Sequence, residues 1–266
     1  MIRTLTRSDQ TLILNFAYQH EEENMFITGA FEQTKNPFEQ NAYYGYFDGD
    51  KMTGLAVYFG EWENFNINSQ EESVVRVLTD HIVQKGHPIK DIACFRRYGD
   101  IIMDQLEKLG IKAKEVEDKS IYKLLVKDFV DFSTGKEEQS TEKDRKDLVL
   151  QERISFGNDA DAPITEMETN RIIPSQEFVI RKDGKIITKA KISGLSKNYF
   201  QIGGVGTLPE YRGQGLAKQV VSALCKTYLA QRKSGILFTS NNNPSAIKVY
   251  KTLGFKPFDR YMIAHY

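Results

Sequence analysis

Residues 211–217, Tyr-Arg-Gly-Gln-Gly-Leu-Ala, have the composition and spacing of an anion-binding turn. They follow an apolar, glycine-containing run at 200–207 that predicts a strand, and residues 217–228 repeat apolar side chains at helical spacing. The first N–H groups of a helix have no partner within it and lie at its positive end. The two glycines leave those groups uncovered, and Arg212 adds a permanent positive charge. The segment therefore predicts a pyrophosphate held by backbone amides at a strand–helix junction.

Two other phosphate-binding turns are excluded by the residues around this one. A P-loop needs Lys-Ser or Lys-Thr after its last glycine, and neither follows here. The dinucleotide fingerprint Gly-x-Gly-x-x-Gly begins at Gly204 and Gly206 but meets Pro209 at its last position. What remains is the pattern Arg-x-x-Gly-x-Ala, which runs from Arg212 to Ala217.

A second motif lies further along, where residues 243–255 read Asn-Pro-Ser-Ala-Ile-Lys-Val-Tyr-Lys-Thr-Leu-Gly-Phe. Together the two motifs resemble the GNAT superfamily of N-acetyltransferases, over roughly residues 175–266. The resemblance implies acetyl-CoA as cosubstrate, lying between two splayed parallel strands with its pantetheine against the backbone of 204–207. The cofactor-binding residues that it implies are Val205, Gly206, Thr207, Arg212, Gly213, Gln214, Gly215, Leu216, Ala217, Asn243 and Ser245.

The resemblance also assigns chemical roles within these motifs. A backbone N–H near Val205 is expected to hold the thioester carbonyl, which gains negative charge as an amine attacks it. Tyr250 is expected to protonate the departing CoA thiolate, since a phenol and a thiol have pKa values only ~1.5 units apart. Its place on an apolar helical stripe is equally that of a core tyrosine. Asn243 is expected to cap its helix and to contact the pantetheine or phosphate arm.

The sequence does not identify a general base. Many relatives place a carboxylate on the glycine-rich strand, but Gln201, Gly203 and Val205 supply none here. We therefore expect a water relay. Glu177 is the leading candidate for a base or substrate contact, and further acids that could face the cleft are Asp161, Glu166 and Glu168.

We interpret the chain as two copies of one α/β unit. Residues 44–59 and 178–192 each place strand-like runs on either side of an Asp-Gly turn, which indicates a hairpin. Residues 100–111 and 245–255 each form an amphipathic helical pattern that ends in Leu-Gly and an apolar residue. We expect an α/β fold of the α+β type, with mixed sheets in two tandem GNAT-like domains.

The two copies differ in their capacity to bind a phosphate. A polar run near residue 140 marks the boundary and predicts a degenerate domain at 1–132, a charged linker at 133–147 and a catalytic domain at 148–266. Where the second copy has its glycine turn, the first has Asn-Ser-Gln-Glu-Glu-Ser at 68–73, with two carboxylates and no glycine. The N-terminal copy is therefore expected to have lost the cofactor.

Composition narrows the setting and the partners. Lys plus Arg equal Asp plus Glu at 36 each, so we expect no nucleic-acid partner and no anionic membrane. No run approaches the ~18 apolar residues of a membrane span, and no signal peptide is recognisable. Cys94 and Cys225 are expected to be reduced core thiols of a cytoplasmic protein. The histidines show no ligand spacing, so no metal is expected.

These observations predict an acetyl-CoA-dependent N-acetyltransferase with one working site, in the C-terminal copy. The acceptor is expected to be a primary amine of a small molecule or peptide, attacking directly in a ternary complex, because no Cys or Ser lies in a nucleophile motif. Two alternatives remain: a protein that senses acyl-CoA without turnover, and an acyltransferase for larger acyl groups. The protein is expected to be a monomer or a homodimer.

Overall fold

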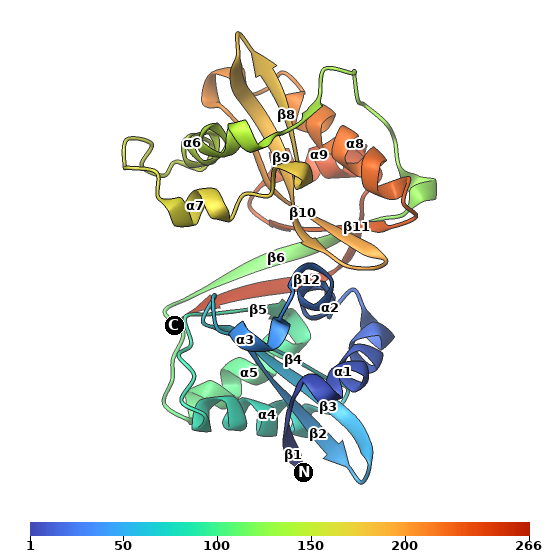
Figure 1. Ribbon diagram of the computed structural model, residues 1–266, viewed down its shortest axis with the longest axis vertical. Coiled ribbons are helices and arrows are strands. Elements are labelled where there is room, and N and C mark those ends of the chain that lie inside the picture. The colour runs from blue at the N-terminus through green and yellow to red at the C-terminus, as the bar shows by residue number, and fades with distance from the viewer. The chain divides into compact units, whose positions relative to one another are not determined.

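The computed structural model describes residues 1–266, and the chain divides into two compact units (Figure 1). Unit 1 contains Met1–Ile121, Phe238–Asn242 and Phe258–Tyr266, and unit 2 contains Tyr122–Leu237 and Asn243–Pro257. None of the helices combines the length and the apolar composition needed to cross a bilayer.

Unit 1 is a mixed sheet with helices packed on it. Its elements are β1 (Ile2–Leu5), α1 (Gln10–Ala17), α2 (Met25–Gln33), α3 (Pro37–Gln40), β2 (Asn41–Asp48), β3 (Lys51–Phe59), β4 (Asn64–Ser69), α4 (Glu72–Gln84), β5 (Asp91–Phe95) and α5 (Arg96–Lys108), together with most of β6 (Glu115–Leu124) and most of β12 (Lys256–His265). The strands pair in the order β1-β2-β3-β4-β5-β12-β6. Helix α4 packs on β3, β4 and α5.

The Asp-Gly hairpin predicted in unit 1 is present. Strands β2 and β3 pair antiparallel up to Asp48 and Lys51, and Gly49 has a φ of 56°. This left-handed conformation is one that glycine adopts without the Cβ clash of other residues. The apolar side chains of these strands form a core with α1 and α2, which includes Ile13, Tyr43 and Leu55.

The end of the chain belongs to unit 1. Strand β12 pairs antiparallel with β5, from Tyr261 opposite Phe95 to His265 opposite Asp91. Met262 and Ala264 of β12 are fully buried. The last strand of the sequence therefore completes the sheet of the unit that contains the N-terminus.

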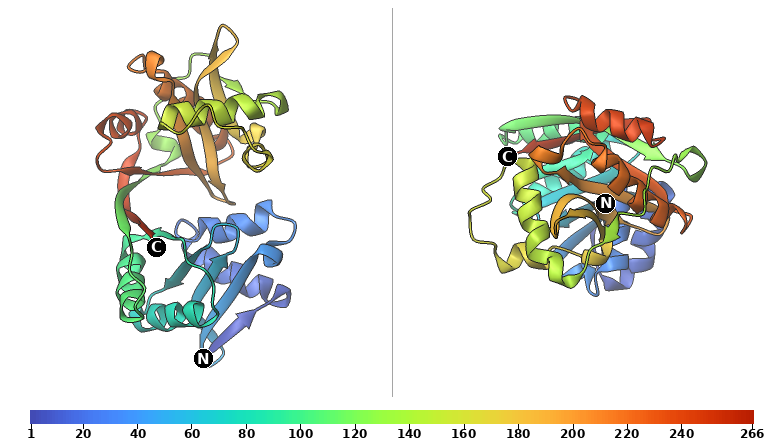
Figure 2. Two further views of the ribbon diagram at one scale, coloured as in Figure 1. Left: turned by 90° about the vertical axis from the view of Figure 1, so that its left-hand side faces the viewer. Right: turned by 90° about the horizontal axis from the view of Figure 1, so that it is seen from above.

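Unit 2 contains the remaining strands of the twelve-stranded sheet, with helices on both faces. Its elements are β7 (Glu138–Gln139), α6 (Arg145–Phe156), α7 (Glu166–Asn170), β8 (Glu177–Lys182), β9 (Lys185–Leu195), β10 (Tyr199–Thr207), α8 (Leu216–Leu229), β11 (Ser234–Ser240) and α9 (Pro244–Thr252). The strand order is β11-β10-β9-β8-β7. Helix α6 contacts β9 and β10, and α8 contacts β8, β9 and β10; the two helices lie on opposite faces (Figures 1 and 2).

The second predicted hairpin, β8–β9, turns at Asp183 and Gly184, which have φ values of 50° and 78°. Two consecutive positive φ values are typical of the two-residue turn that Asp-Gly favours. The charged segment 133–147 belongs to unit 2, and most of its residues are exposed. Glu138 pairs with Val179 of β8, and α6 begins at Arg145.

The core of unit 2 lies between the sheet and α8. Fully buried residues of this core include Val220, Leu224 and Cys225 of α8, which pack against Phe200 of β10. The apolar spacing of 217–228 thus faces the sheet, as the sequence predicts. Cys225 and Cys94 of unit 1 are both buried and free, and burial raises the pKa of both thiols.

Candidate acyl-CoA site

Strands β10 and β11 are parallel neighbours that separate after a short paired stretch. Their pairs are Tyr199 with Ser234, Phe200 with Gly235 and Gln201 with Ile236. Strand β10 then continues to Thr207 without a partner on this edge. Its backbone groups there are free to pair with an added extended chain, which is the interaction of a bound strand-like ligand.

A bulge interrupts β10 where its pairing with β11 has ended. On the β9 side, Gly203 pairs with Lys191 and Gly206 with Lys189, so Gly204 and Val205 both lie opposite Ala190. Gly204 has a φ of 53°. This arrangement is a β-bulge, in which two residues of one strand lie opposite one residue of the next. A bulge with a left-handed glycine turns the local backbone N–H groups away from the hydrogen bonds of the sheet.

The glycine turn follows β10 and opens helix α8. A short 3-10 helix at Pro209–Tyr211 leads into it, and Gly213 and Gly215 have φ values of 76° and 79°. Nothing lies within 4 Å of a Cβ added at either glycine. The first helical hydrogen bond runs from Gln219 N to Gly215 O, so the earlier amides have no partner within the helix. Gln214 is exposed, and Leu216 and Ala217 form the half-buried first turn.

Arg212 binds the protein's own backbone in this structure. Its Nε donates to the carbonyl oxygen of Thr207 at 3.1 Å, and its Nη2 donates to that of Ser155 at 2.9 Å. The guanidinium therefore ties the glycine turn to the end of β10 and to α6. Its charge stays beside the turn, and two of its nitrogens donate to carbonyl groups while the residue remains exposed. The partner on α6, Ser155, is not identifiable from the sequence motif.

Asn243 caps helix α9. Its Oδ1 accepts hydrogen bonds from the backbone N of Ala246 at 3.1 Å and from the Oγ of Ser245 at 2.8 Å. Both Asn243 and Ser245 are exposed. The N-cap role predicted from the sequence is therefore present, while the amide Nδ2 stays available on the surface.

Tyr250 lies in the core of unit 2, with 8% of its surface exposed. Its ring meets Phe255 edge-on at 5.9 Å between centroids. Burial raises the pKa of the Tyr250 phenol to about 12, so the group is protonated at every physiological pH. Burial therefore keeps the proton on Tyr250 but makes the phenol a weaker acid than an ordinary tyrosine, and it widens the pKa difference from the CoA thiol.

One known protein family matches the part of the chain that contains this site. A family model described as the acetyltransferase (GNAT) family matches residues 136–255. Residues 136–255 form a GNAT acetyltransferase domain. No curated protein sequence matches the chain.

Solved structures extend the likeness in fold to the whole chain. A tandem GNAT protein from the clavulanic acid biosynthesis pathway has a TM-score of 0.64 at 12% identity, covering 99% of this chain and 97% of its own. A GNAT-family acetyltransferase from Colwellia psychrerythraea has 0.60 at 16%, covering 100% and 99%, and a Drosophila protein has 0.72 at 10%, covering 100% and 98%. At these identities the likeness is one of fold, and it covers both units.

Glu177 of the GNAT domain is enclosed rather than open to a cleft. It is 2% exposed, and its Oε2 accepts a hydrogen bond from Nζ of Lys189 at 2.9 Å. Lys189 is itself fully buried. A carboxylate held in this way has no surface to offer to an incoming amine.

Glu152 of α6 is the acidic residue that the sequence did not single out. Its Oε2 lies 2.5 Å from Nζ of Lys189 and 3.0 Å from Nζ of Lys191, and its side chain is 31% exposed. Burial acts to raise the pKa of the Glu152 carboxyl, but the two ammonium groups outweigh it and the pKa is lowered. Of the two carboxylates in this cluster, Glu152 is therefore the one that solvent reaches.

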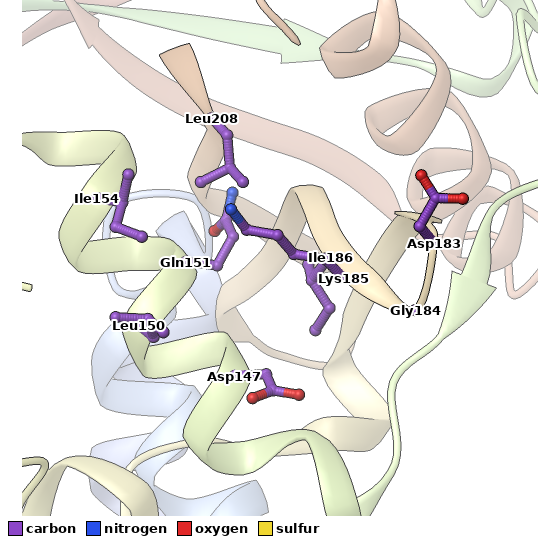
Figure 3. A pocket seen from close by; sticks show the side chains of 9 residues that line it. All are labelled: Asp147, Leu150, Gln151, Ile154, Asp183, Gly184, Lys185, Ile186 and Leu208. Carbon is purple, nitrogen blue, oxygen red and sulfur yellow. The ribbon is translucent and has the colours of Figure 1, made fainter. Parts of the chain in front are cut away.

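A separate hollow of about 310 Å³ lies between α6 and the β8–β9 hairpin (Figure 3). The side chains of Gln151 and Ile154 line it from α6, and those of Ile186 and Leu208 line it from the sheet side. None of the sequence-predicted site residues lines this hollow. It approaches the candidate site through Gln151, whose Nε2 donates to the carbonyl oxygen of Gly206 at 2.9 Å.

The corresponding region of unit 1 is occupied by a carboxylate. Strands β4 and β5 share a single parallel pair, Asn64 with Asp91, and so also separate. Glu23 links the end of β4 to α5. Its Oε2 accepts hydrogen bonds from Nδ2 of Asn68 of β4 at 3.0 Å and from the hydroxyl of Tyr98 of α5 at 2.6 Å. Unit 1 thus has a hydrogen-bonded carboxylate beside the end of β4, where unit 2 has its glycine turn after β10.

Proposed function

We propose that the GNAT domain transfers an acetyl group from acetyl-CoA to a primary amine of a small molecule or peptide. The observation that carries this proposal is the unpaired edge of β10 that continues into the glycine turn and the uncovered amides of α8. The edge suits a pantetheine, and the amides suit a pyrophosphate. Residues 205–207, 212–217, 243 and 245 would hold the cosubstrate.

The proposed reaction is a direct attack within a ternary complex. The neutral amine nitrogen forms a bond to the thioester carbonyl carbon, and the carbon–sulfur bond then breaks to release the CoA thiolate. The bulge of β10 supplies a backbone N–H near Val205 to the carbonyl oxygen, and losing one such donor typically costs about 3–4 kcal/mol of barrier. Tyr250 gives its proton to the thiolate, and water accepts the proton that the amine loses.

Glu177 is a poor general base in this proposal, because it is enclosed and paired with Lys189. A water relay to solvent remains the simpler route for the amine proton. The buried free thiols of Cys94 and Cys225 agree with a reducing, cytoplasmic setting.

The test is a screen of primary amines with acetyl-CoA, in which release of the CoA thiol is followed and the product is identified by mass. We expect at least one class of amine to gain 42 Da, about one acetyl group, with stoichiometric thiol release. Acetyl-CoA binding without turnover of any amine would contradict the transfer and favour a sensor. The absence of a carboxylate on β10 is the observation that favours that alternative.

A larger acyl group has less support than the sequence indicated. A Cβ added at Gly203 would lie 1.9 Å from Oγ of Ser193, and one at Gly204 would lie 2.7 Å from Cε of Lys191. One at Gly206 would meet Ser155 at 2.7 Å. The faces of these glycines are therefore covered by side chains, so the glycines are explained by close packing and are no longer evidence for a larger acyl group.

A further inference from the structure

Two lysines of β9 flank the bulge of β10. Lys191 is paired in register with Gly203 on one side of it, and Lys189 with Gly206 on the other. The side chain of Lys189 has no exposed surface, and that of Lys191 is 27% exposed. The aliphatic stem of Lys191 lies directly over Gly204, because a Cβ there would approach its Cγ, Cδ and Cε to 2.7–2.9 Å.

Both ammonium groups converge on one carboxylate, that of Glu152 on α6. Lys189 also binds Glu177 of β8. Burying a lone ammonium costs several kcal/mol, so Lys189 is tolerated in its charged form only while these partners stay in place. The four side chains form a charge cluster with no net charge, which we call the Lys189 cluster (Glu152, Glu177, Lys189 and Lys191).

Helix α6 holds the same bulge by a second contact. Gln151, adjacent to Glu152, donates its Nε2 hydrogen bond to the carbonyl oxygen of Gly206 at 2.9 Å. Thr188 of β9 donates to the same oxygen at 2.9 Å. The downstream end of the bulge is therefore fixed by hydrogen bonds from α6 and β9, and both flanks are fixed through the Lys189 cluster.

We infer that Lys189 is a positioning residue for the acyl-transfer site: its buried charge locks α6, β8 and β9 around the β10 bulge and fixes the amides of Gly204 and Val205. This inference rests on the proposed function, because those amides matter if they meet a thioester carbonyl. Stabilisation of a developing charge depends on donors held within a few tenths of an ångström. The pyrophosphate turn at 212–217 is a separate element, so cosubstrate affinity should depend little on the cluster.

The test compares two variants with the wild type. Lys189→Met alone leaves Glu177 buried without its partner and is expected to unfold more easily. The double variant Lys189→Met/Glu177→Met removes both charges and keeps the volume, and replacing a buried pair by apolar residues is often neutral for stability. Lys185→Met, at an exposed lysine on the same strand, is the matched control.

We expect the double variant to melt within a few degrees of the wild type and to lose about tenfold or more in kcat. The KM for acetyl-CoA should stay within about twofold, because the phosphate turn is intact. The loss should be the same factor from pH 6 to pH 9, whereas loss of a general base would change the shape of the pH profile. Wild-type kcat in the double variant would overturn the inference.

A second measurement needs no activity. Backbone ¹⁵N order parameters of Gly204 and Val205 in the free protein should be near ~0.85 in the wild type and below ~0.6 in the double variant. Unchanged order parameters would overturn the positioning role even if no amine substrate is ever found. Failure of the proposed function would give a different result. The bulge of the wild-type protein would still be ordered, but the wild-type protein would not bind acetyl-CoA.

Discussion

Gly215 keeps the start of α8 open, and any side chain at this position would change the anion site that we propose there. Its φ of 79° lies in the left-handed region, and the space beside it is open. An L-residue there is strained whatever its size, and an acidic one also places negative charge at the amides of α8. The affinity of this site for a phosphate should therefore depend on this position more than on the exposed side chain of Gln214.

Gly215→Glu should weaken acetyl-CoA binding by at least about 100-fold, through the lost geometry of the turn and charge repulsion at the pyrophosphate. Isothermal titration measures the affinity, and thermal unfolding shows whether the fold is retained. Gln214→Glu separates the two effects, since it adds the same charge to the turn without changing a glycine, and it should weaken binding less than Gly215→Glu. Equal affinity in the wild type and Gly215→Glu would show that the turn does not bind the cosubstrate.

Tyr250→Phe should lower kcat about 10- to 100-fold and leave the KM for acetyl-CoA nearly unchanged, because it removes the proton donor and keeps the ring that packs on Phe255. The measurement is steady-state kinetics on the amine found by the screen. Tyr228→Phe, another tyrosine of the same core, is the control. If both variants turn over like the wild type, Tyr250 is a core residue only.

At the scale of single residues, the sequence predicted what local chemistry determines and missed what comes from tertiary pairing. The left-handed glycines at 213 and 215 and the Asn243 cap follow from residue type and neighbours. Glu152 and Lys189 were missed because their partners lie on other elements. Lys189 is 37 residues from Glu152 and 12 residues from Glu177 in the sequence. A charged residue in a predicted strand is expected to be exposed, because charged side chains are seldom buried unless they are paired.

At the scale of elements, β12 is held in unit 1 by a histidine between two carboxylates. The imidazole of His265 binds Asp91 of β5 through Nδ1 and Glu117 of β6 through Nε2, at 3.0 Å for the second contact. The hydrogen bonds from Glu117 and then Asp91 raise the pKa of His265 above its ordinary value, despite some desolvation. In its protonated form the imidazolium therefore ties the last strand to both of its neighbours.

This arrangement predicts a pH-dependent contribution to stability. Because the pKa is raised in the folded state, the contribution is fully present below the unfolded-state pKa of about 6.5 and is lost as pH rises through the folded-state pKa. His265→Gln should lower the free energy of unfolding by less than about 1 kcal/mol at pH 6, since the side chain is 37% exposed, and by less still at pH 9.

Urea unfolding at the two pH values measures this difference, and His20→Gln, at an exposed histidine of the same unit, is the control. A loss for His265→Gln that is equal at pH 6 and pH 9 would contradict the stabilising role of the protonated imidazole.

The position of β12 illustrates which strand pairings sequence patterns do not predict. The Asp-Gly hairpins were predictable because their partners are adjacent, whereas the pairing of the last strand with β5 joins segments about 170 residues apart.

At the scale of the whole molecule, the two copies share a fold and differ in one functional region. Both contain a parallel pair of strands that separates, β4 with β5 and β10 with β11. In unit 1, Glu71 and Glu72 begin α4 and the Glu23 carboxylate lies between Asn68 and Tyr98. Glu23 is paired with Arg97, so it is the two acids at the start of α4 that disfavour a pyrophosphate there. The asymmetry was visible in the sequence as acids in place of glycines.

The most direct test of this account is isothermal titration of acetyl-CoA into the purified full chain, with the stoichiometry fitted. The account predicts one molecule bound per chain in the wild type and none in Gly215→Glu. Glu23→Gln should leave that stoichiometry at one, because α4 still begins with two acids. A fitted stoichiometry of two, or one site that survives Gly215→Glu, would contradict the claim that unit 2 alone holds the acyl-CoA site.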